Sequence, residues 1–250
     1  MPEHPKFPRD TIQEALCEFR LRPSDQPYWT PKTPGLIFAA LGTDKFPGME
    51  PINEFGLEIV VGPNGQAQQK FVQGPPRYRF SNADDTRLVQ ASPTLYAFNT
   101  IRSYPGWDEF QKLILDNWAI VQAEVRPSAV ERVALRYINR IPAHPESQIS
   151  DWLKHSAYIP KAIDQATNGL KFRLESNLSD TETVIVSILR DPAGNQTSDI
   201  FLDLDRARLN IGLPSSEELR DIINGLHEAI WEIFESAKTE RLDAYLNGKG

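Results

Sequence analysis

The chain has 250 residues, enough for one large domain or two small ones with a substantial buried core. Apolar residues make up 40 % of the sequence, which is typical of a globular protein and excludes a disordered one. With 27 Lys and Arg against 34 Asp and Glu, the net charge of −7 disfavours nucleic acid and anionic membranes as partners.

Cysteine content and hydropathy indicate the compartment. Cys17 is the only cysteine, so the chain has no intrachain disulfide, as is usual in a reducing cytoplasm. Its place in an alternating segment favours a small core residue over a nucleophile. The longest apolar runs fall far short of the ~20 residues of a membrane-spanning helix, and the polar start has no signal-like apolar region. We therefore expect a soluble, cytoplasmic protein that does not enter a membrane.

The first half of the chain predicts successive strands followed by a helix. Alternating side chains at 14–21 predict a first strand. Residues 22–56 are rich in Pro and Gly and predict a long irregular excursion. Apolar side chains at helical spacing predict an amphipathic helix over 107–125. Between the excursion and this helix, further strands are expected at 57–61, 66–72, 77–81, 87–91 and 95–101.

The second half predicts the same order of elements. Strands are expected at 130–141, 170–178, 184–190 and 199–209. A long helix then begins after Ser215, which forms a capping box with Glu218, and is expected to run towards Leu246. Strands in succession with helices after them indicate the α+β class. We expect two similar antiparallel β-sheet units of about four or more strands, residues 1–126 and 127–250, each followed by a long amphipathic helix. They form either separate units or one continuous sheet in a single compact domain.

The strand at 130–141 carries three cationic side chains on one face. Alternation places Arg132, Arg136 and Arg140 together on that face. Such a stripe of guanidinium groups is a candidate site for a small phosphorylated or carboxylated ligand of an enzyme or sensor. The alternative, which we favour, is ion pairing across neighbouring strands. The available carboxylate partners are Glu175, Asp203 and Asp205.

Sequence motifs for catalysis are absent. The chain has no Gly-x-Gly-x-x-Gly, no Gly-Lys-Ser/Thr phosphate loop and no Gly-x-Ser-x-Gly elbow. Its four histidines show no metal-ligand spacing, and His227 is interpreted as a core-edge or helix-contact residue. Asp203-Leu-Asp205 alone is a weak magnesium signal, because acidic alternation on a solvated strand looks identical. We predict no catalytic residue, no metal site and no cofactor.

Five stretches of sequence carry a resemblance that covers nearly the whole chain. They are IQEALCEF at 12–19, FSN at 80–82 with LVQ at 88–90, YPGWDEF at 104–110, LRYINRI at 135–141 and the expected helix around Leu226-His227. In this order they resemble a sporadically distributed family of bacterial and archaeal proteins that has no assigned reaction. The resemblance implies a domain of about this length and carries over no catalytic residue. Its patchy distribution implies an accessory role, for example in defence or toxin control.

Aromatic side chains in the Pro-rich excursion are candidates for partner binding. Tyr28, Trp29 and Phe38 either fill the domain's own core or present an apolar patch to another protein. Open antiparallel sheets also leave edge strands on which a partner can dock. Together with the missing catalytic motifs, these features predict a non-catalytic binding protein with a protein partner. Self-association into a homo-oligomer is a further alternative.

Overall fold

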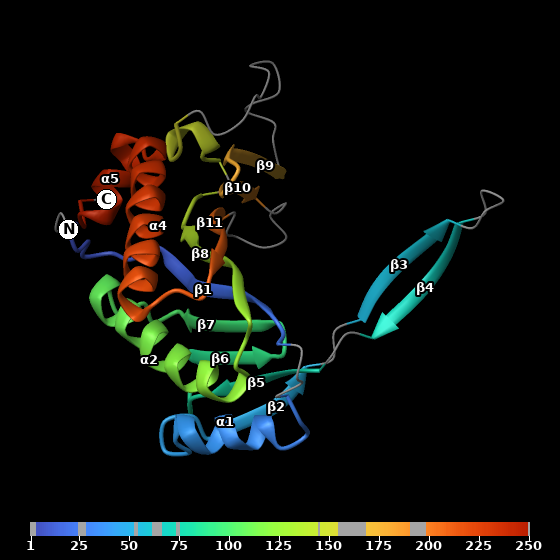
Figure 1. Ribbon diagram of the computed structural model, residues 1–250. Coiled ribbons are helices and arrows are strands. Elements are labelled where there is room, and N and C mark those ends of the chain that lie inside the picture. Colours follow the sequence, from blue (N-terminus) through green and yellow to red (C-terminus); the bar gives the residue numbers. More distant parts are fainter. Residues whose placement is uncertain are drawn as a thin grey trace.

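A computed structural model describes residues 4–24, 29–52, 55–61, 67–73, 76–144, 146–154, 169–190 and 199–249. Nine antiparallel strands in this part of the chain form one sheet that draws on both halves of the sequence (Figure 1). The first half contributes β1 (Ile12–Arg22), β2 (Gly48–Ile52), β5 (Arg77–Ser81), β6 (Arg87–Ser92) and β7 (Leu95–Ile101). The second half contributes β8 (Ala129–Ile141), β9 (Leu170–Ser179), β10 (Glu182–Arg190) and β11 (Ile200–Gly212).

The strand order places the junction of the two halves in the middle of the sheet. The order is β2-β5-β6-β7-β1-β8-β11-β10-β9, so β1 and β8 pair at the centre and β2 and β9 form the edges. β3 (Phe55–Val61) and β4 (Ala67–Gln73) form a separate two-stranded sheet. The predicted α+β class with an antiparallel sheet is therefore confirmed.

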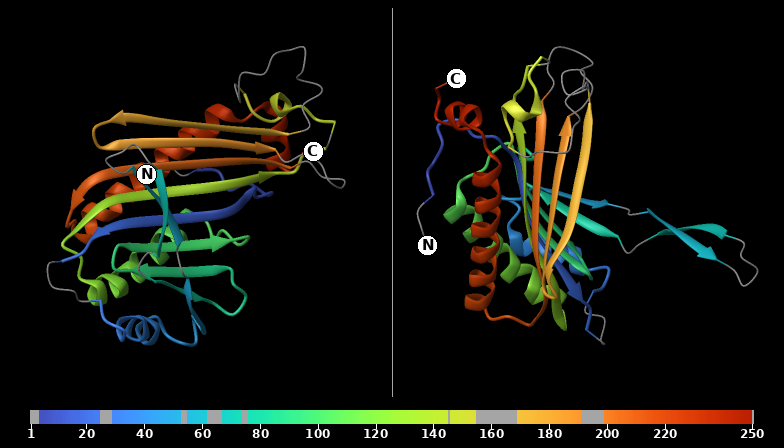
Figure 2. Two further views of the ribbon diagram at one scale, coloured as in Figure 1. Left: turned by 90° about the vertical axis from the view of Figure 1, so that its right-hand side faces the viewer. Right: turned by 90° about the horizontal axis from the view of Figure 1, so that it is seen from above.

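Four α-helices in the described residues accompany the sheet: α1 (Thr33–Leu41), α2 (Trp107–Val125), α4 (Ser216–Ala237) and α5 (Glu240–Leu246). α2 packs on β6 and β7, and α4 packs on β8 and β11, so both lie on the same face of the sheet (Figure 2). α1 packs against α2. The opposite face of the sheet is covered by none of the described helices. Within the described residues, no helix has both the length and the apolar character needed to span a membrane.

The hydrophobic core lies between the sheet and the two long helices. Alternation along β1 buries Cys17 and Phe19 completely, which confirms Cys17 as a core residue. The ring of Phe19 lies 5.1 Å from that of Tyr96 on β7 and 4.8 Å from that of Trp118 on α2. The hydroxyl of Tyr96 donates to the carbonyl of Ile114 at 2.8 Å, so this buried polar group is satisfied.

Two regions differ from the sequence prediction. Residues 22–56, expected to be irregular, contain both α1 and β2. Pro34 lies in the first turn of α1, where a missing N–H breaks no intrahelical hydrogen bond, so this proline is compatible with a helix start. The final helix does not run through to Leu246, because α4 ends at Ala237 and the side chain of Thr239 caps the separate helix α5.

Candidate functional site

The arginine stripe of β8 is held by carboxylates from both neighbouring strands. Arg136 makes a bidentate pair with Asp203 of β11, with Nε 2.8 Å from Oδ1 and Nη2 2.6 Å from Oδ2. This pairing raises the pKa of Arg136 above its ordinary value. Arg132 lies between two acids, with Nη2 3.0 Å from Asp205 Oδ1 and Nη1 3.2 Å from Glu18 Oε1 of β1. The predicted partners Asp203 and Asp205 are therefore confirmed.

The third arginine of the stripe is also paired. Arg140 Nε lies 2.5 Å from Oδ2 of Asp199, a residue just before β11 that was not among the expected partners. The expected partner Glu175 instead pairs with Arg173 on its own strand, at 2.6 Å. Because β9 is separated from β8 by two strands, Glu175 lies too far away to serve the stripe.

The ion pairs line a hollow on the face of the sheet that faces away from α2 and α4. The hollow has a volume of about 390 Å³ and is lined by the paired side chains of Glu18, Arg132, Arg136 and Asp205. A site for a phosphorylated or carboxylated ligand needs cationic groups that have no carboxylate partner of their own. All three arginines have one, so the geometry gives no support to an anion-binding stripe.

The aromatic residues of the Pro-rich segment contribute to the chain's own core. Trp29 packs near Tyr78 of β5, with ring centroids 6.4 Å apart, and Phe38 of α1 stacks near Phe80 at 6.3 Å. Both are partly buried against the main core. Tyr28 lies outside the described residues. For Trp29 and Phe38, packing within the domain accounts for the aromatic side chain without a partner.

The two edges of the sheet differ in how they are protected. β2 has five residues and contains Pro51, and both features discourage further pairing. β9 has ten residues and no proline, and within the described chain its outer edge has no strand partner. Leu174 is 49 % exposed and Leu178 is 50 % exposed. Leu174 lies opposite Val186, which lies opposite the core residue Leu204, so Leu174 belongs to the face that α4 partly covers. Leu178 falls at a break in the register with β10.

A second cavity, of about 100 Å³, lies where the segment before β1 meets β8, β11 and α4. Two tyrosine hydroxyls and a histidine ring nitrogen at its wall lie in a row within hydrogen-bonding distance. The hydroxyls of Tyr104 and Tyr137 are 3.1 Å apart, and that of Tyr137 lies 3.2 Å from Nδ1 of His227 on α4. Burial lowers the pKa of His227 to about 3, with the charge of nearby His4 adding to the effect, so the ring is neutral near pH 7. The other lining residues are mainly apolar, among them Phe7, Ile230, Trp231, Phe234 and Leu246.

Beside this cavity, the fold brings together three groups that can coordinate a metal ion. His4 Nε2 lies 2.9 Å and 3.0 Å from the two carboxylate oxygens of Glu228. One ligand atom from each of His4, His227 and Glu228 lies within 4.8 Å of the others. The His4 ring stacks on Trp231 at 4.3 Å, and the His227 ring stacks on Trp107 at 3.9 Å, nearly parallel. Aromatic stacking thus fixes both imidazoles.

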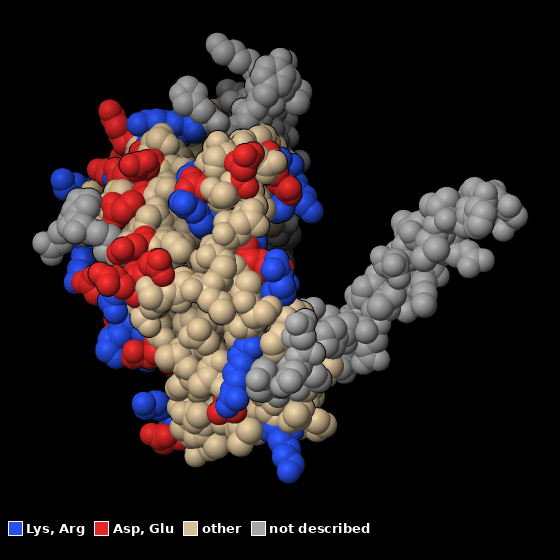
Figure 3. Space-filling view, viewed as in Figure 1, with Lys and Arg blue, Asp and Glu red and all other residues tan. Residues whose placement is uncertain are grey.

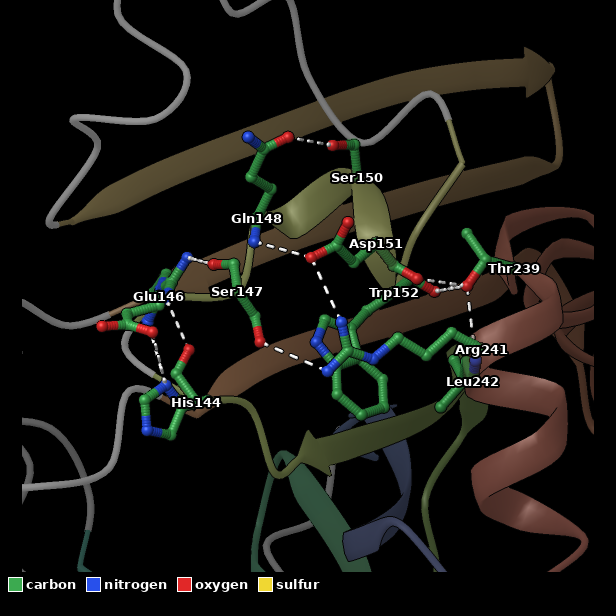
Figure 4. A network of polar contacts seen from close by, with 11 residues as sticks. His144, Glu146, Ser147, Gln148, Ser150, Asp151, Trp152, Thr239, Arg241 and Leu242 are labelled. Carbon is green, nitrogen blue, oxygen red and sulfur yellow. Dashed lines mark hydrogen bonds and ion pairs between the residues drawn. The ribbon is translucent and has the colours of Figure 1, made fainter. Parts of the chain in front are cut away.

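A polar network fastens the start of α5 (Figure 4). Further along, α5 contributes Leu246 to the wall of the cavity. The short 3-10 helix η1 (Ile149–Asp151) precedes Trp152, whose ring lies 4.5 Å from the guanidinium of Arg241. The same guanidinium pairs with Asp151 at 3.3 Å, and the hydroxyl of Thr239 donates to the Asp151 carbonyl at 2.6 Å. These contacts hold the start of α5 against η1, and we assign the network a structural role.

Comparison with models of protein families finds none that matches this chain. Comparison with curated proteins finds no match either. The resemblance of these sequence stretches to a sporadically distributed family therefore stays a prediction, and the function is argued mainly from the geometry.

Spacing along the sequence gave no indication that His4 and His227 meet. They are more than 200 residues apart, and they come together because the segment before β1 runs along α4. The backbone N–H of Arg9 donates to the carbonyl of Leu246 at 3.1 Å, and Phe7 stacks near Trp231. The one local signal was the adjacent pair His227-Glu228 on a helix. That pair alone does not distinguish a ligand set from a solvated helix face.

Proposed function

We propose that this chain is a non-catalytic binding protein that holds an extended segment of a protein partner along the outer edge of β9. The observation that carries the proposal is the outer edge of β9, which has no strand partner among the described residues: ten residues without proline, two of them half-exposed leucines. Such an edge offers backbone N–H and C=O groups that an added strand satisfies, while the leucines offer side-chain contacts that select the partner.

We further propose that the two halves are copies of one unit, because their connectivity corresponds. Counted outward from the centre, the order β1-β7-β6-β5 matches β8-β11-β10-β9, and α2 follows β7 as α4 follows β11. In this correspondence β9 takes the place of β5. The outer edge of β5 is covered by β2 through five residue pairs. A partner strand on β9 would take the place that β2 occupies on β5. Relatives whose halves share no residue pattern at equivalent strands would argue against the duplication.

The proposal is tested by photocrosslinking from the edge. A photoreactive amino acid is placed at position 174, and in a second protein at position 36. Leu36 on α1 is an equally exposed leucine, at 52 %, and serves as the matched control. In cells of the native host we expect a discrete protein adduct from position 174 and none from position 36. Absence of an adduct at 174 would argue against the β9 edge as the binding surface.

A binding measurement then decides whether the edge carries the affinity. The crosslinked partner is purified and its Kd is compared for the unmodified chain, Leu174→Asp and Leu36→Asp. We expect at least tenfold weaker binding for Leu174→Asp, because a carboxylate buried against an apolar strand is strongly disfavoured. Leu36→Asp should bind like the unmodified chain. Equal affinity of all three proteins contradicts the proposal.

The identity of the adduct distinguishes the kinds of protein partner. An adduct of twice the mass of the chain identifies a second copy, and antiparallel pairing centred on Leu174 would then set Arg173 of one copy opposite Glu175 of the other. A different protein identifies a heterologous complex. The accessory or defence role implied by the family resemblance belongs to the same proposal, and it calls for a heterologous partner whose gene lies near that of this chain.

A further inference from the structure

We propose that His4, His227 and Glu228 together bind a divalent transition-metal ion of the zinc class. The site lies where the segment before β1 crosses α4, away from the β9 edge, so it is independent of the proposed protein-binding surface. Two imidazole nitrogens and one carboxylate oxygen lie within 4.8 Å of one another. This combination of ligands suits zinc and its neighbours in the first transition series, and it suits magnesium and calcium poorly.

The distances are compatible with coordination after small side-chain movements. His4 Nε2 and the Glu228 carboxylate are in direct contact at 2.9 Å. A bound ion would lie about 2.0–2.2 Å from each ligand atom, so it would replace this hydrogen bond. The side chains of His4 and Glu228 are 19 % and 28 % exposed, so an ion can enter from solvent. Three protein ligands leave a coordination position open for water.

The buried ligand is oriented in the manner of a metal-binding histidine. Nδ1 of His227 lies 3.2 Å from the hydroxyl of Tyr137, which leaves Nε2 as the coordinating atom. Hydrogen bonding at the non-coordinating nitrogen, which sets the tautomer and the ring plane, is a usual feature of metal sites. Stacking on Trp107 at 3.9 Å further restrains the ring. The His227 ring is therefore positioned before an ion arrives.

The surrounding charge also favours a cation. α4 carries six acidic residues and one arginine, and acidic groups gather over this helix in the space-filling view (Figure 3). A surface of this sign raises the local concentration of divalent cations. Because the ligands come from the two ends of the chain, a bound ion would also fasten the segment before β1 to α4. Metal binding should then stabilise the folded state.

Calorimetric titration tests the site directly. Untagged protein, freed of metal with EDTA and then dialysed, is titrated with ZnCl₂ and separately with CoCl₂. We expect one ion per chain, and Co²⁺ should give visible absorption bands of a site with nitrogen ligands. Since Trp231 and Trp107 stack on the two imidazoles, Co²⁺ should also quench tryptophan fluorescence at the same stoichiometry.

Three variants localise the ion. His4→Ala and Glu228→Gln should each weaken binding at least tenfold. Both side chains are partly exposed, so folding is expected to be retained and is checked by circular dichroism. His144→Ala is the matched control, because His144 is an exposed histidine near a carboxylate, with Nδ1 3.9 Å from Glu146, outside the cluster. Absence of stoichiometric binding overturns the proposal. Binding that survives both cluster substitutions but is lost in His144→Ala overturns it as well.

Discussion

A single buried thiol shows how packing determines chemistry at the scale of one residue. Cys17 lies on β1, in register with Phe98 on one side and Leu135 on the other, and is 0 % exposed. Burial raises the pKa of this thiol well above its ordinary value, and the charge of neighbouring Glu18 adds to the effect. The thiol therefore stays protonated in the folded protein, in keeping with a core residue and not with a nucleophile.

The raised pKa of Cys17 predicts a loss of stability at alkaline pH. In the unfolded chain the thiol ionises near its ordinary pKa of about 8.5, whereas the folded protein keeps the proton. The free energy of unfolding therefore falls as the pH rises above that value. Between pH 8.5 and 10.5 the thiol should cost about 2 kcal/mol of stability.

Urea unfolding of the unmodified chain and of Cys17→Ala measures this contribution. Buried tyrosines such as Tyr96 and Tyr137 also have raised pKa values, but they are common to both proteins and cancel in the difference. We expect the free energy of unfolding to fall by about 2 kcal/mol less in Cys17→Ala than in the unmodified chain over this pH range. An equal fall in the free energy of unfolding of the two proteins would mean that the thiol also ionises in the folded state.

At the same scale, sequence reasoning succeeded where a residue's neighbours lie on adjacent predicted strands. The pairing of Arg136 with Asp203 followed from alternation on two strands and from opposite charge. It failed for His4 and His227, whose contact depends on the path of a segment that has no periodic pattern. A periodic strand limits the positions of its side chains, whereas an irregular segment does not.

At the scale of one element, the start of α4 was predicted in atomic detail. The N–H of Glu218 donates to Ser215 Oγ at 3.2 Å, and the N–H of Ser215 donates to the Glu218 carboxylate at 2.8 Å. Two N–H groups that the helix leaves unpaired are satisfied in this way. Capping depends only on residues three apart, so a single sequence is sufficient to identify it.

The capping box predicts a measurable cost for losing one hydroxyl. Ser215→Ala should lower the free energy of unfolding by about 1 kcal/mol, because the Glu218 N–H loses its acceptor. Ser216→Ala is the control, since Ser216 is the first residue of the helix and no described contact involves its side chain as a cap. Ser216→Ala should alter the free energy of unfolding by no more than about 0.5 kcal/mol. Chemical denaturation of the three proteins gives both differences, and equal losses for the two variants would exclude a role for the cap.

Other elements were predicted from their periodicity, apart from α1, β2 and the break between α4 and α5. Strands and long helices produce alternation or helical spacing over many residues, and these were located correctly from β5 to β8. α1 was missed because proline was read as a sign of irregular chain, although Pro34 lies in a first helical turn. The position of β9 at an edge was not predictable, since edge or centre is decided by pairing and not by the strand's own residues.

At the scale of the whole molecule, the sequence left open whether the halves make one sheet. The decisive contact is the pairing of β1 with β8, which sets Cys17 opposite Leu135 through ten matched residue pairs. In the sequence, β1 and β8 are both ordinary alternating segments, and each could have been the edge strand of a separate sheet. Which strands pair, when they are more than 100 residues apart, depends on the combined packing of both helices. Local sequence patterns carry no information about that packing.

The central pairing predicts that the two halves unfold together. Arg132 of β8 reaches Glu18 of β1, Trp107 of α2 stacks on His227 of α4, and these contacts cross the boundary between the halves. Separating the halves would expose the edges of β1 and β8 along with the apolar face beneath them. Calorimetry should therefore show one transition, with the calorimetric enthalpy equal to the van 't Hoff enthalpy.

Fragments give an independent measurement of the same coupling. Chains covering 1–126 and 127–250 should each lack cooperative unfolding when alone, because each has lost the partner of its central strand. Mixed in equal amounts, they should recover the circular dichroism and the transition of the intact chain, since all contacts across the boundary are noncovalent. Fragments that each unfold cooperatively, together with two separate transitions in the intact chain, would mean that the halves are independent domains that only share a sheet edge.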